Sequence, residues 1–165
     1  MTIFATTVTA SVPTDLATTF QHLTGMDVPA VFRGAGPLPA VTAVRQQTGD
    51  WDAVGQTRTI VLSDQSSAFE TLDLYQFPHT FGYTVTNYTS VLRLLVTKGV
   101  ATWQCTSTPD GTLISWQYAY HTRSVLAVPV VWLLMVLFWK KYMRAAVNIL
   151  QTQLQAALTS PNALP

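Results

Sequence analysis

The chain has 165 residues, of which 48% are hydrophobic and 10% are charged. This length suits one domain, and the low charge leaves much of its surface neutral or apolar. The net charge is +1 and no segment gathers a run of basic residues, so we expect no nucleic-acid partner. A single cysteine, Cys105, excludes an internal disulfide, and the N-terminus lacks the pattern of a secretion signal, so a cytoplasmic protein is expected.

The N-terminal part of the chain predicts one strand and two short helices. Apolar residues occupy most even positions of residues 4–12, which is the period of a half-buried strand. Thr14 or Asp15 can cap a following helix that ends near Gly25. A second helical turn is expected over residues 29–32.

Residues 40–121 form a succession of short β-type runs separated by turn signals. The turn Thr-Pro-Asp-Gly at 108–111 is well suited to a hairpin, because Pro presets one dihedral angle and Gly accepts a positive φ. With the first strand, the expected strands number seven. The six later ones cover residues 40–46, 56–62, 68–76, 81–88, 100–106 and 112–121.

The last predicted strand has an aromatic face. Trp116, Tyr118 and Tyr120 fall on one side of the strand, because side chains alternate between the two faces. We expect this side to be packed under another element.

Beyond Val128 apolar residues recur at steps of three and four, which predicts one long helix with a continuous apolar stripe against the sheet. Residues 159–165 are expected to be a flexible tail following a single domain at 1–158. The stripe consists of Val128, Trp132, Met135, Trp139, Met143, Ala146, Leu150, Leu154 and Leu158.

Residues 125–139 contain no charge and raise the question of a membrane span. As a helix they would be about 22 Å long, against roughly 30 Å of hydrocarbon, so a buried helix is favoured. A second set of apolar residues, Val131, Leu134 and Phe138, lies on another side of this helix. Neighbouring loops or a partner subunit would cover it, or it would form an exposed interaction surface.

The order of one strand, two short helices, six strands and a long C-terminal helix is the helix-grip arrangement, an α+β fold. The motifs VTASVPTDLATTFQHL, VGQTR, Phe69-Glu70, GTLISWQYAY and Lys141-Tyr142-Met143 extend over nearly the whole chain. With them the chain resembles the polyketide cyclase/dehydrase-like branch of the START and SRPBCC superfamily. It departs from that pattern at Asp64-Gln65, where relatives tend to have Asp-Gly.

This resemblance implies a bent seven-stranded antiparallel sheet wrapped on the C-terminal helix, with an apolar cavity between them. It implies no cofactor and no shared catalytic residue, since the superfamily includes both carriers and cyclases.

Two residues are candidates for acid–base chemistry, which needs a titratable group inside an apolar pocket. Glu70 lies opposite Arg58 if their strands pair, either as a buried acid next to a cation or, as we favour, as an ordinary cross-strand ion pair. His121 ends the last strand near the expected cavity entrance, where it would act as an acid or base or would simply be solvated. The histidines lack the spacing of metal ligands, so no metal is expected.

The candidates for ligand binding are large apolar residues, which commonly form the walls of small-molecule pockets. The alternative is that they fill the core and leave no cavity. They are Trp103, Trp116, Tyr118 and Tyr120 in the last two strands, and Trp132, Met135, Trp139 and Met143 in the helix.

The sequence therefore favours a protein that binds an apolar or aromatic small molecule, such as a lipid or polyketide-like compound, with Gln117, Tyr118, Tyr120 or Glu70 orienting it. One alternative is an aromatase/cyclase or dehydratase of the same fold. Another is a module that docks on a membrane or a protein through the apolar start of the last helix. A homodimer through the same patch is also compatible with the sequence, and peripheral membrane contact is not favoured.

Overall fold

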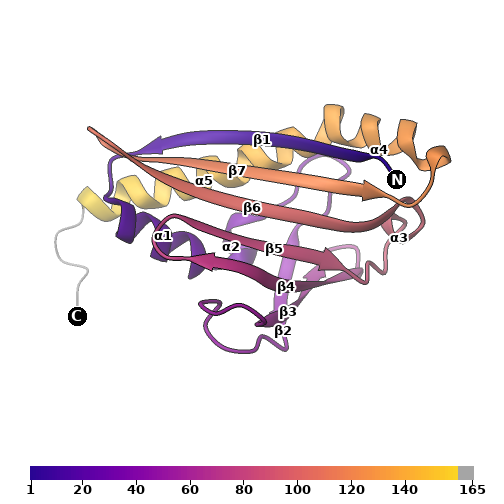
Figure 1. The fold of residues 1–165 in the computed structure, drawn as a ribbon, viewed down its shortest axis with the longest axis horizontal. Helices are drawn as coiled ribbons and strands as arrows, with labels where there is room; N and C mark the ends of the chain where they lie inside the picture. The colour runs from indigo at the N-terminus through magenta and orange to yellow at the C-terminus, as the bar shows by residue number, and fades with distance from the viewer. Residues whose placement is uncertain (160–165) are drawn as a thin grey trace.

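The computed structural model describes residues 1–159 and contains one seven-stranded antiparallel sheet (Figure 1). The predicted strands are confirmed, and the largest shift of an end is at β6, which begins at Val96 rather than at residue 100. The spatial order is β1-β7-β6-β5-β4-β3-β2. The strands are β1 (Ile3–Val12), β2 (Val41–Arg45), β3 (Thr57–Leu62), β4 (Ser67–Gln76), β5 (Thr80–Thr86), β6 (Val96–Thr108) and β7 (Gly111–Thr122).

The sheet is strongly bent, as the resemblance implied. Irregularities in pairing occur between Val41 and Ala43, between Leu72 and Leu74, and between Val96 and Lys98. Such bulges increase the local twist and bend a strand. In Figure 1 the strands β2, β3 and β4 curve away from the long strands β1, β7 and β6. The bend gives the sheet a concave face.

The hairpin between β6 and β7 has the predicted turn, with Thr108 paired to Gly111. Gly111 has a φ of 141°, and a Cβ at this position would collide with the backbone of Val12 and Pro13. The turn therefore needs glycine for its conformation and for the close approach of the end of β1.

Three short helices connect the strands: α1 (Leu16–Thr24), α2 (Val28–Val31) and α3 (Leu92–Leu95). The carboxylate of Asp15 caps α1 by accepting the N–H of Thr18 at 3.0 Å, and Gly25 ends this helix, both as predicted. Helix α3 was not predicted, and its residues 92–95 precede the start of β6.

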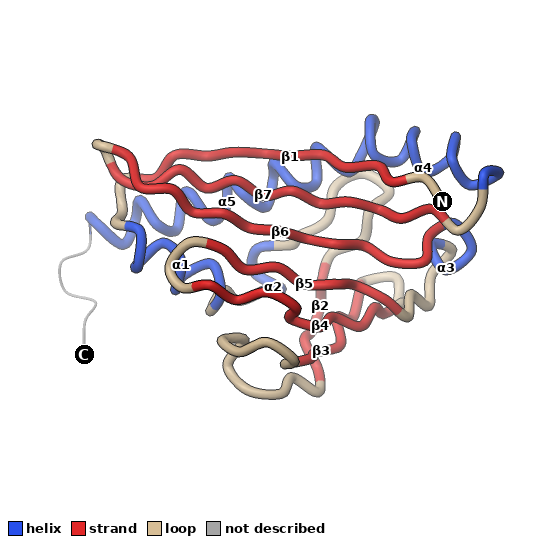
Figure 2. The backbone as a smooth tube through the Cα atoms, viewed as in Figure 1, coloured by secondary structure: helices blue, strands red, loops and turns tan. Residues whose placement is uncertain are grey.

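The C-terminal helix is continuous but not uniform. It begins with a 3₁₀ turn, η1 (Val125–Ala127), continues through α4 (Val128–Leu134) and a π-helical segment, η2 (Met135–Trp139), and ends as α5 (Lys140–Thr159). Figure 2 shows it crossing behind the strands. Thr159, assigned to the tail from sequence, is helical, and residues 160–165 of the predicted tail lie outside the described residues.

The two parts of this helix differ in burial. In α5 the predicted stripe is confirmed for Met143, Ala146, Leu150 and Leu154, which are buried against the sheet, but Leu158 is 54% exposed. The expected burial of residues 125–139 is wrong: Val131 and Met135 are buried, but most of the large apolar side chains are exposed. The exposed ones are Val125, Leu126, Val130, Trp132, Leu133, Val136 and Leu137.

The reason is that the segment is apolar on all sides while the sheet covers only one of them. By length and composition alone, helix Val125–Thr159 could cross a membrane. Only 22% of its most apolar stretch is buried inside the protein. That low burial distinguishes it from the core helix that the sequence favoured.

The interior near α1 is filled by aromatic rings. Phe20 meets Tyr75, Phe77 and Phe81 edge to face at 5.4–5.5 Å between ring centroids. Phe81 stacks on Trp103 at 5.8 Å. Trp103 in turn stacks on Trp116 at 4.5 Å, so a column of rings leads from α1 to the middle of the sheet.

Candidate functional site

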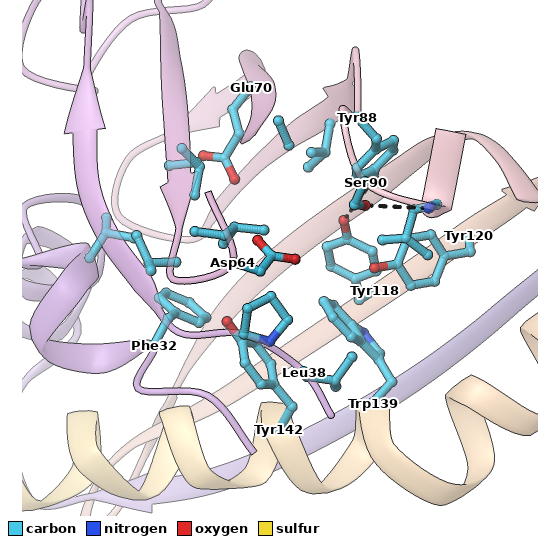
Figure 3. Close-up of a pocket in the computed structure, with 18 of the residues that line it drawn as sticks. Phe32, Leu38, Asp64, Glu70, Tyr88, Ser90, Tyr118, Tyr120, Trp139 and Tyr142 are labelled. Atoms are coloured by element: carbon cyan, nitrogen blue, oxygen red, sulfur yellow. Dashed lines mark hydrogen bonds between the residues drawn. The ribbon is translucent and has the colours of Figure 1, made fainter. Parts of the chain in front are cut away.

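A cavity of about 340 Å³ lies between the bent part of the sheet and the junction of η2 and α5. Most of its lining is apolar, including Val41, Ile60, Ala68 and Val85 from four neighbouring strands. Figure 3 shows the cavity with Trp139 and Tyr142 rising from the helix below it. The cavity has the size and character of a small-molecule site, for which about 300–1,000 Å³ is usual.

Aromatic rings form the wall between β7 and the helix. Trp139 lies 4.8 Å from Tyr118 and 5.1 Å from Tyr120, measured between ring centroids. Trp139 also stacks on Tyr142 at 5.1 Å, and Tyr142 stacks on Phe32 at 6.0 Å. These contacts hold the rings in place, so the wall is preformed.

Two tyrosine hydroxyls meet at one side of the cavity. The hydroxyl oxygens of Tyr88 and Tyr118 lie 3.4 Å apart (Figure 3). They approach the backbone of Gly99, where a Cβ would overlap both hydroxyls. Burial raises the pKa of Tyr88 and of Tyr118 above 10, so both hydroxyls keep their protons at neutral pH and can donate a hydrogen bond.

A buried ion pair lies at another side of the cavity. Arg58 on β3 faces Glu70 on β4, as the predicted pairing requires, and its Nε donates to Glu70 Oε2 at 2.7 Å. The guanidinium of Arg58 also lies 3.9 Å from the centroid of the Trp51 ring. Both side chains are almost fully buried, so this cross-strand pair is shielded from solvent.

Two residues of the cavity wall have a buried indole N–H without a hydrogen-bond partner among the described residues. The indole N–H of Trp116 is buried and has no hydrogen-bond partner among the residues that the structure describes, and the same holds for the indole N–H of Trp139. Both residues line the cavity. Among the described residues, the indole N–H groups of Trp51 and Trp103 also lack a partner, and these two residues do not line the cavity, so the unpaired groups do not by themselves mark a ligand contact.

The structure brings together five of the residues singled out from sequence. Glu70, Trp116, Tyr118, Tyr120 and Trp139 line the cavity. They come from β4, β7 and η2, which are far apart in sequence.

The other ligand-binding candidates lie elsewhere. Trp103 and Met143 are fully buried in the filled part of the core, and Met135 is also buried outside the cavity lining. Trp132 is 52% exposed on the outer side of α4. The helical stripe alone could not separate residues above the cavity from those beside it.

His121 does not line the cavity. It follows Tyr120 on β7, and alternation along the strand directs it to the opposite face of the sheet, where Lys98 is its pairing neighbour. Burial, and then the positive charge of Lys98, lower the pKa of His121 below its ordinary value of 6.5. The geometry offers His121 no contact with a molecule in the cavity.

Several lining residues were missed from sequence, among them Phe32, Tyr88 and Tyr142. Tyr142 follows Trp139 by three residues on the helix, which is a spacing that could have identified it. Phe32 follows the short helix α2 and Tyr88 lies in the loop between β5 and α3, where no periodic pattern identifies a face.

Polar residues also lie among the loops at the edge of the cavity. Asp64 accepts hydrogen bonds from the Ser66 hydroxyl at 2.6 Å and from its N–H at 3.0 Å, which lowers the pKa of the Asp64 carboxyl. Ser90 precedes α3 and accepts the N–H of Leu92 at 3.3 Å (Figure 3). Within residues 1–159, no three His, Cys, Asp or Glu side chains are grouped so that they could hold a metal ion.

Comparison with known proteins identifies the relatives of this arrangement. The sequence pattern of the family described as polyketide cyclase / dehydrase and lipid transport matches residues 4–155. None of the curated proteins matches the sequence.

Solved structures match over nearly the whole chain. Norcoclaurine synthase of Thalictrum flavum, as a point mutant with a transition-state analogue, has a TM-score of 0.73 at 14% identity over 96% of this chain and 98% of that one. The same enzyme with dopamine and hydroxybenzaldehyde gives 0.66 at 15% identity over 92% and 86%. Major latex-like protein 151 of Panax ginseng gives 0.64 at 11% identity over 92% and 97%. At these identities the likeness shows the shared fold.

Proposed function

The chain belongs to the polyketide cyclase/dehydrase and lipid transport family, and we propose that it binds an apolar or aromatic small molecule, lipid- or polyketide-like, between its sheet and C-terminal helix. The observation that carries this proposal is the mostly apolar cavity of about 340 Å³ lined by Trp139 and Tyr142. Its volume is near the lower end of the usual range for ligand pockets, which favours a compact ring system or a short chain.

The distribution of polar groups suggests how such a molecule would be oriented. Aliphatic and aromatic side chains supply affinity through burial of apolar surface, at about 25 cal/mol per Å². The Tyr118 hydroxyl and the Arg58–Glu70 pair would supply a few polar contacts at the walls. A ligand with one or two oxygens on an otherwise apolar frame matches this pattern.

The solved structures of the same fold support the proposal only as to the class of ligand, a small aromatic molecule. Norcoclaurine synthase holds dopamine and hydroxybenzaldehyde, which are small aromatic molecules. The shared fold therefore accommodates ligands of the size that this cavity would accept.

Filling the cavity tests the proposal. Ala68 lines the cavity from β4, so Ala68→Phe should occupy much of the space and reduce binding of an uncharged apolar fluorescent probe such as N-phenyl-1-naphthylamine by about tenfold or more. Ala53→Phe, at an exposed loop position away from the cavity, is the matched control and should bind like the unaltered protein. Equal binding by Ala68→Phe and by the unaltered protein would contradict the assignment of the cavity.

A second candidate function is cyclase or dehydratase chemistry on a bound carbonyl compound. The observation that favours it is the Glu70 carboxylate, which lines the cavity and is held 2.7 Å from the Arg58 Nε. In this role Glu70 would accept or return a proton at the bound molecule. Glu70→Gln should then abolish turnover of a compound that the protein still binds, and unchanged turnover would eliminate this assignment.

A further inference from the structure

The outer side of the C-terminal helix carries an apolar patch, which consists of Leu126, Val130, Trp132, Leu133, Val136 and Leu137. All six are exposed, from 42% at Leu137 to 88% at Leu126. Leu126, Val130, Leu133 and Leu137 follow one another at steps of four, three and four, so they lie along one side of the helix. An exposed apolar patch of this extent marks an interaction surface.

A second element extends the apolar patch. Helix α3 packs beside α4, and Val91 and Leu94 around it are 67% and 63% exposed. In Figure 1 both helices lie at the same end of the molecule. Val91 and Leu94 therefore extend the apolar surface from the C-terminal helix to a second element at the same end.

Cations bracket the apolar patch at both ends. Arg123 precedes η1 and donates from its Nε to the carbonyl of Arg93 at 2.9 Å, which brings these two arginines together. At the other end, Lys140, Lys141 and Arg144 are exposed in the first turns of α5. These five residues define a cationic rim.

No acidic residue close in sequence neutralises the charge of the cationic rim. The same holds for the strands and helices that make the main contacts with the C-terminal helix. The last Asp or Glu of the chain is Asp110, in the hairpin turn between β6 and β7. The elements that make the main contacts with α4, η2 and α5, namely β1, β7, α1, α2, α3 and η1, contain no Asp or Glu. An exposed apolar face with Lys and Arg at its borders is typical of a helix that lies in the interface of an anionic bilayer.

The apolar patch adjoins the cavity. Val91 and Leu92 at α3, Leu134 on α4 and Trp139 on η2 all line the cavity. Leu134 is the neighbour of Leu133, so one turn of helix contributes to the cavity on one side and to the apolar patch on the other.

We propose that the apolar patch and the cationic rim dock the protein on an anionic phospholipid surface, and that the ligand passes between the bilayer and the adjoining cavity. The proposal rests on the proposed function for its second part, because it makes the ligand a bilayer-soluble compound. The uncharged part of the helix, Val125–Trp139, is about 22 Å long, against roughly 30 Å of hydrocarbon. The remainder, α5, buries one side against the sheet, so the exposed apolar segment is suited to lying in the interface.

A second copy of the chain fits the surface less well. In a twofold-symmetric dimer the same patch contacts itself, so the two cationic rims would face each other across the contact. Repulsion between like charges would oppose this arrangement, whereas an anionic membrane attracts all five cations.

Vesicle flotation tests the docking. The protein should float with vesicles of phosphatidylcholine mixed with phosphatidylglycerol, and much less with pure phosphatidylcholine or at high salt. Leu133→Glu should reduce partition to the mixed vesicles by about tenfold or more, because it places a charge where a leucine is buried in lipid. Val54→Glu makes the same change of charge at another exposed apolar residue, in the loop before β3, and should float like the unaltered protein.

Two variants separate docking from ligand binding. Leu133→Glu does not touch the cavity and should keep its affinity for the uncharged probe N-phenyl-1-naphthylamine, whereas Ala68→Phe should lose the probe and still float. Loss of probe binding by Ala68→Phe with no flotation of any form would leave the proposed function standing and overturn the docking.

Two further results would overturn the docking proposal. One is flotation of Leu133→Glu equal to that of the unaltered protein. The other is a native mass spectrum showing a dimer that Leu133→Glu converts to a monomer, because a second copy would then cover the apolar patch.

Discussion

The interior between the sheet and the C-terminal helix has a filled end and a hollow end. Near α1, Phe20, Phe81 and Trp103 are fully buried and packed ring against ring. Near the junction of η2 and α5, the same sheet and the same helix enclose about 340 Å³. Both ends contain aromatic residues at similar spacings, so residue type alone does not decide which end is packed.

The difference arises from the bend of the sheet and from small residues at positions 68 and 99. Bulges bend β2 and β4 away from the long strands beside the hollow end. There Ala68 lines the cavity with a single methyl group, and Gly99 leaves room for the hydroxyls of Tyr88 and Tyr118. A cavity thus persists where large side chains would otherwise meet.

The largest expected effect is at the filled end. Phe20→Ala should lower the free energy of unfolding by about 3–5 kcal/mol, because it removes a fully buried ring and leaves a void among three others. Urea unfolding followed by circular dichroism measures the loss. Leu133→Ala, at an exposed position, should change stability by about 0.5 kcal/mol or less. Similar losses in both variants would contradict the description of the filled end.

At the hollow end, the next largest effect on stability is expected from the buried Arg58–Glu70 ion pair. Arg58→Met leaves the buried carboxylate of Glu70 without its cation, and should lower the free energy of unfolding by about 3 kcal/mol. The double variant Arg58→Met with Glu70→Leu removes both charges and should recover most of that loss. A double variant as unstable as the single one would show that the cost comes from packing and not from the unpaired charge.

A smaller effect is expected where Gly99 makes room for the tyrosine hydroxyls. Gly99→Ala should displace Tyr88 and Tyr118 toward the cavity and weaken probe binding by about tenfold, which corresponds to about 1.4 kcal/mol. Gly25→Ala, at the end of α1, is the control, and titration of both variants with the probe gives the comparison. An unchanged affinity in Gly99→Ala would show that these hydroxyls do not border the ligand.

The smallest effect concerns His121, which lies on the face of the sheet opposite the cavity. Because its pKa is lower in the folded protein than its ordinary 6.5, the unfolded chain binds more protons as the pH falls below that value. Stability should therefore decrease slightly on acidification from pH 7, and His121→Gln should decrease less over the same range. Thermal melts at several pH values measure this, and a steeper fall in the variant would reverse the sign that the burial of His121 implies.

The sequence predicted the architecture well, for a physical reason. Alternation along the strands, the Thr-Pro-Asp-Gly turn and the caps at Asp15 and Gly25 are local signals, and each acts in the structure as expected. The inner face of β7 with Trp116, Tyr118 and Tyr120 is likewise confirmed as buried.

The site was predictable only in part, because a cavity depends on what distant elements leave unfilled. Trp103 and Trp116 both lie on inner faces of paired strands, yet Trp103 is in the filled core and Trp116 borders the cavity. The exposure of Trp132 was missed because a helix that is apolar on all sides has no preferred face. Whether the protein forms a homodimer and whether it resides in the cytoplasm stay predictions from sequence.

The most direct test of the central claim is the native mass spectrum of freshly purified protein, paired with mass spectrometry of its organic extract. We predict a mass above that of the chain by one small apolar molecule, released into the extract and absent from Ala68→Phe. An unaltered protein that carries no adduct and binds neither its host's lipid extract nor an apolar probe would contradict the claim that the hollow end is a ligand site.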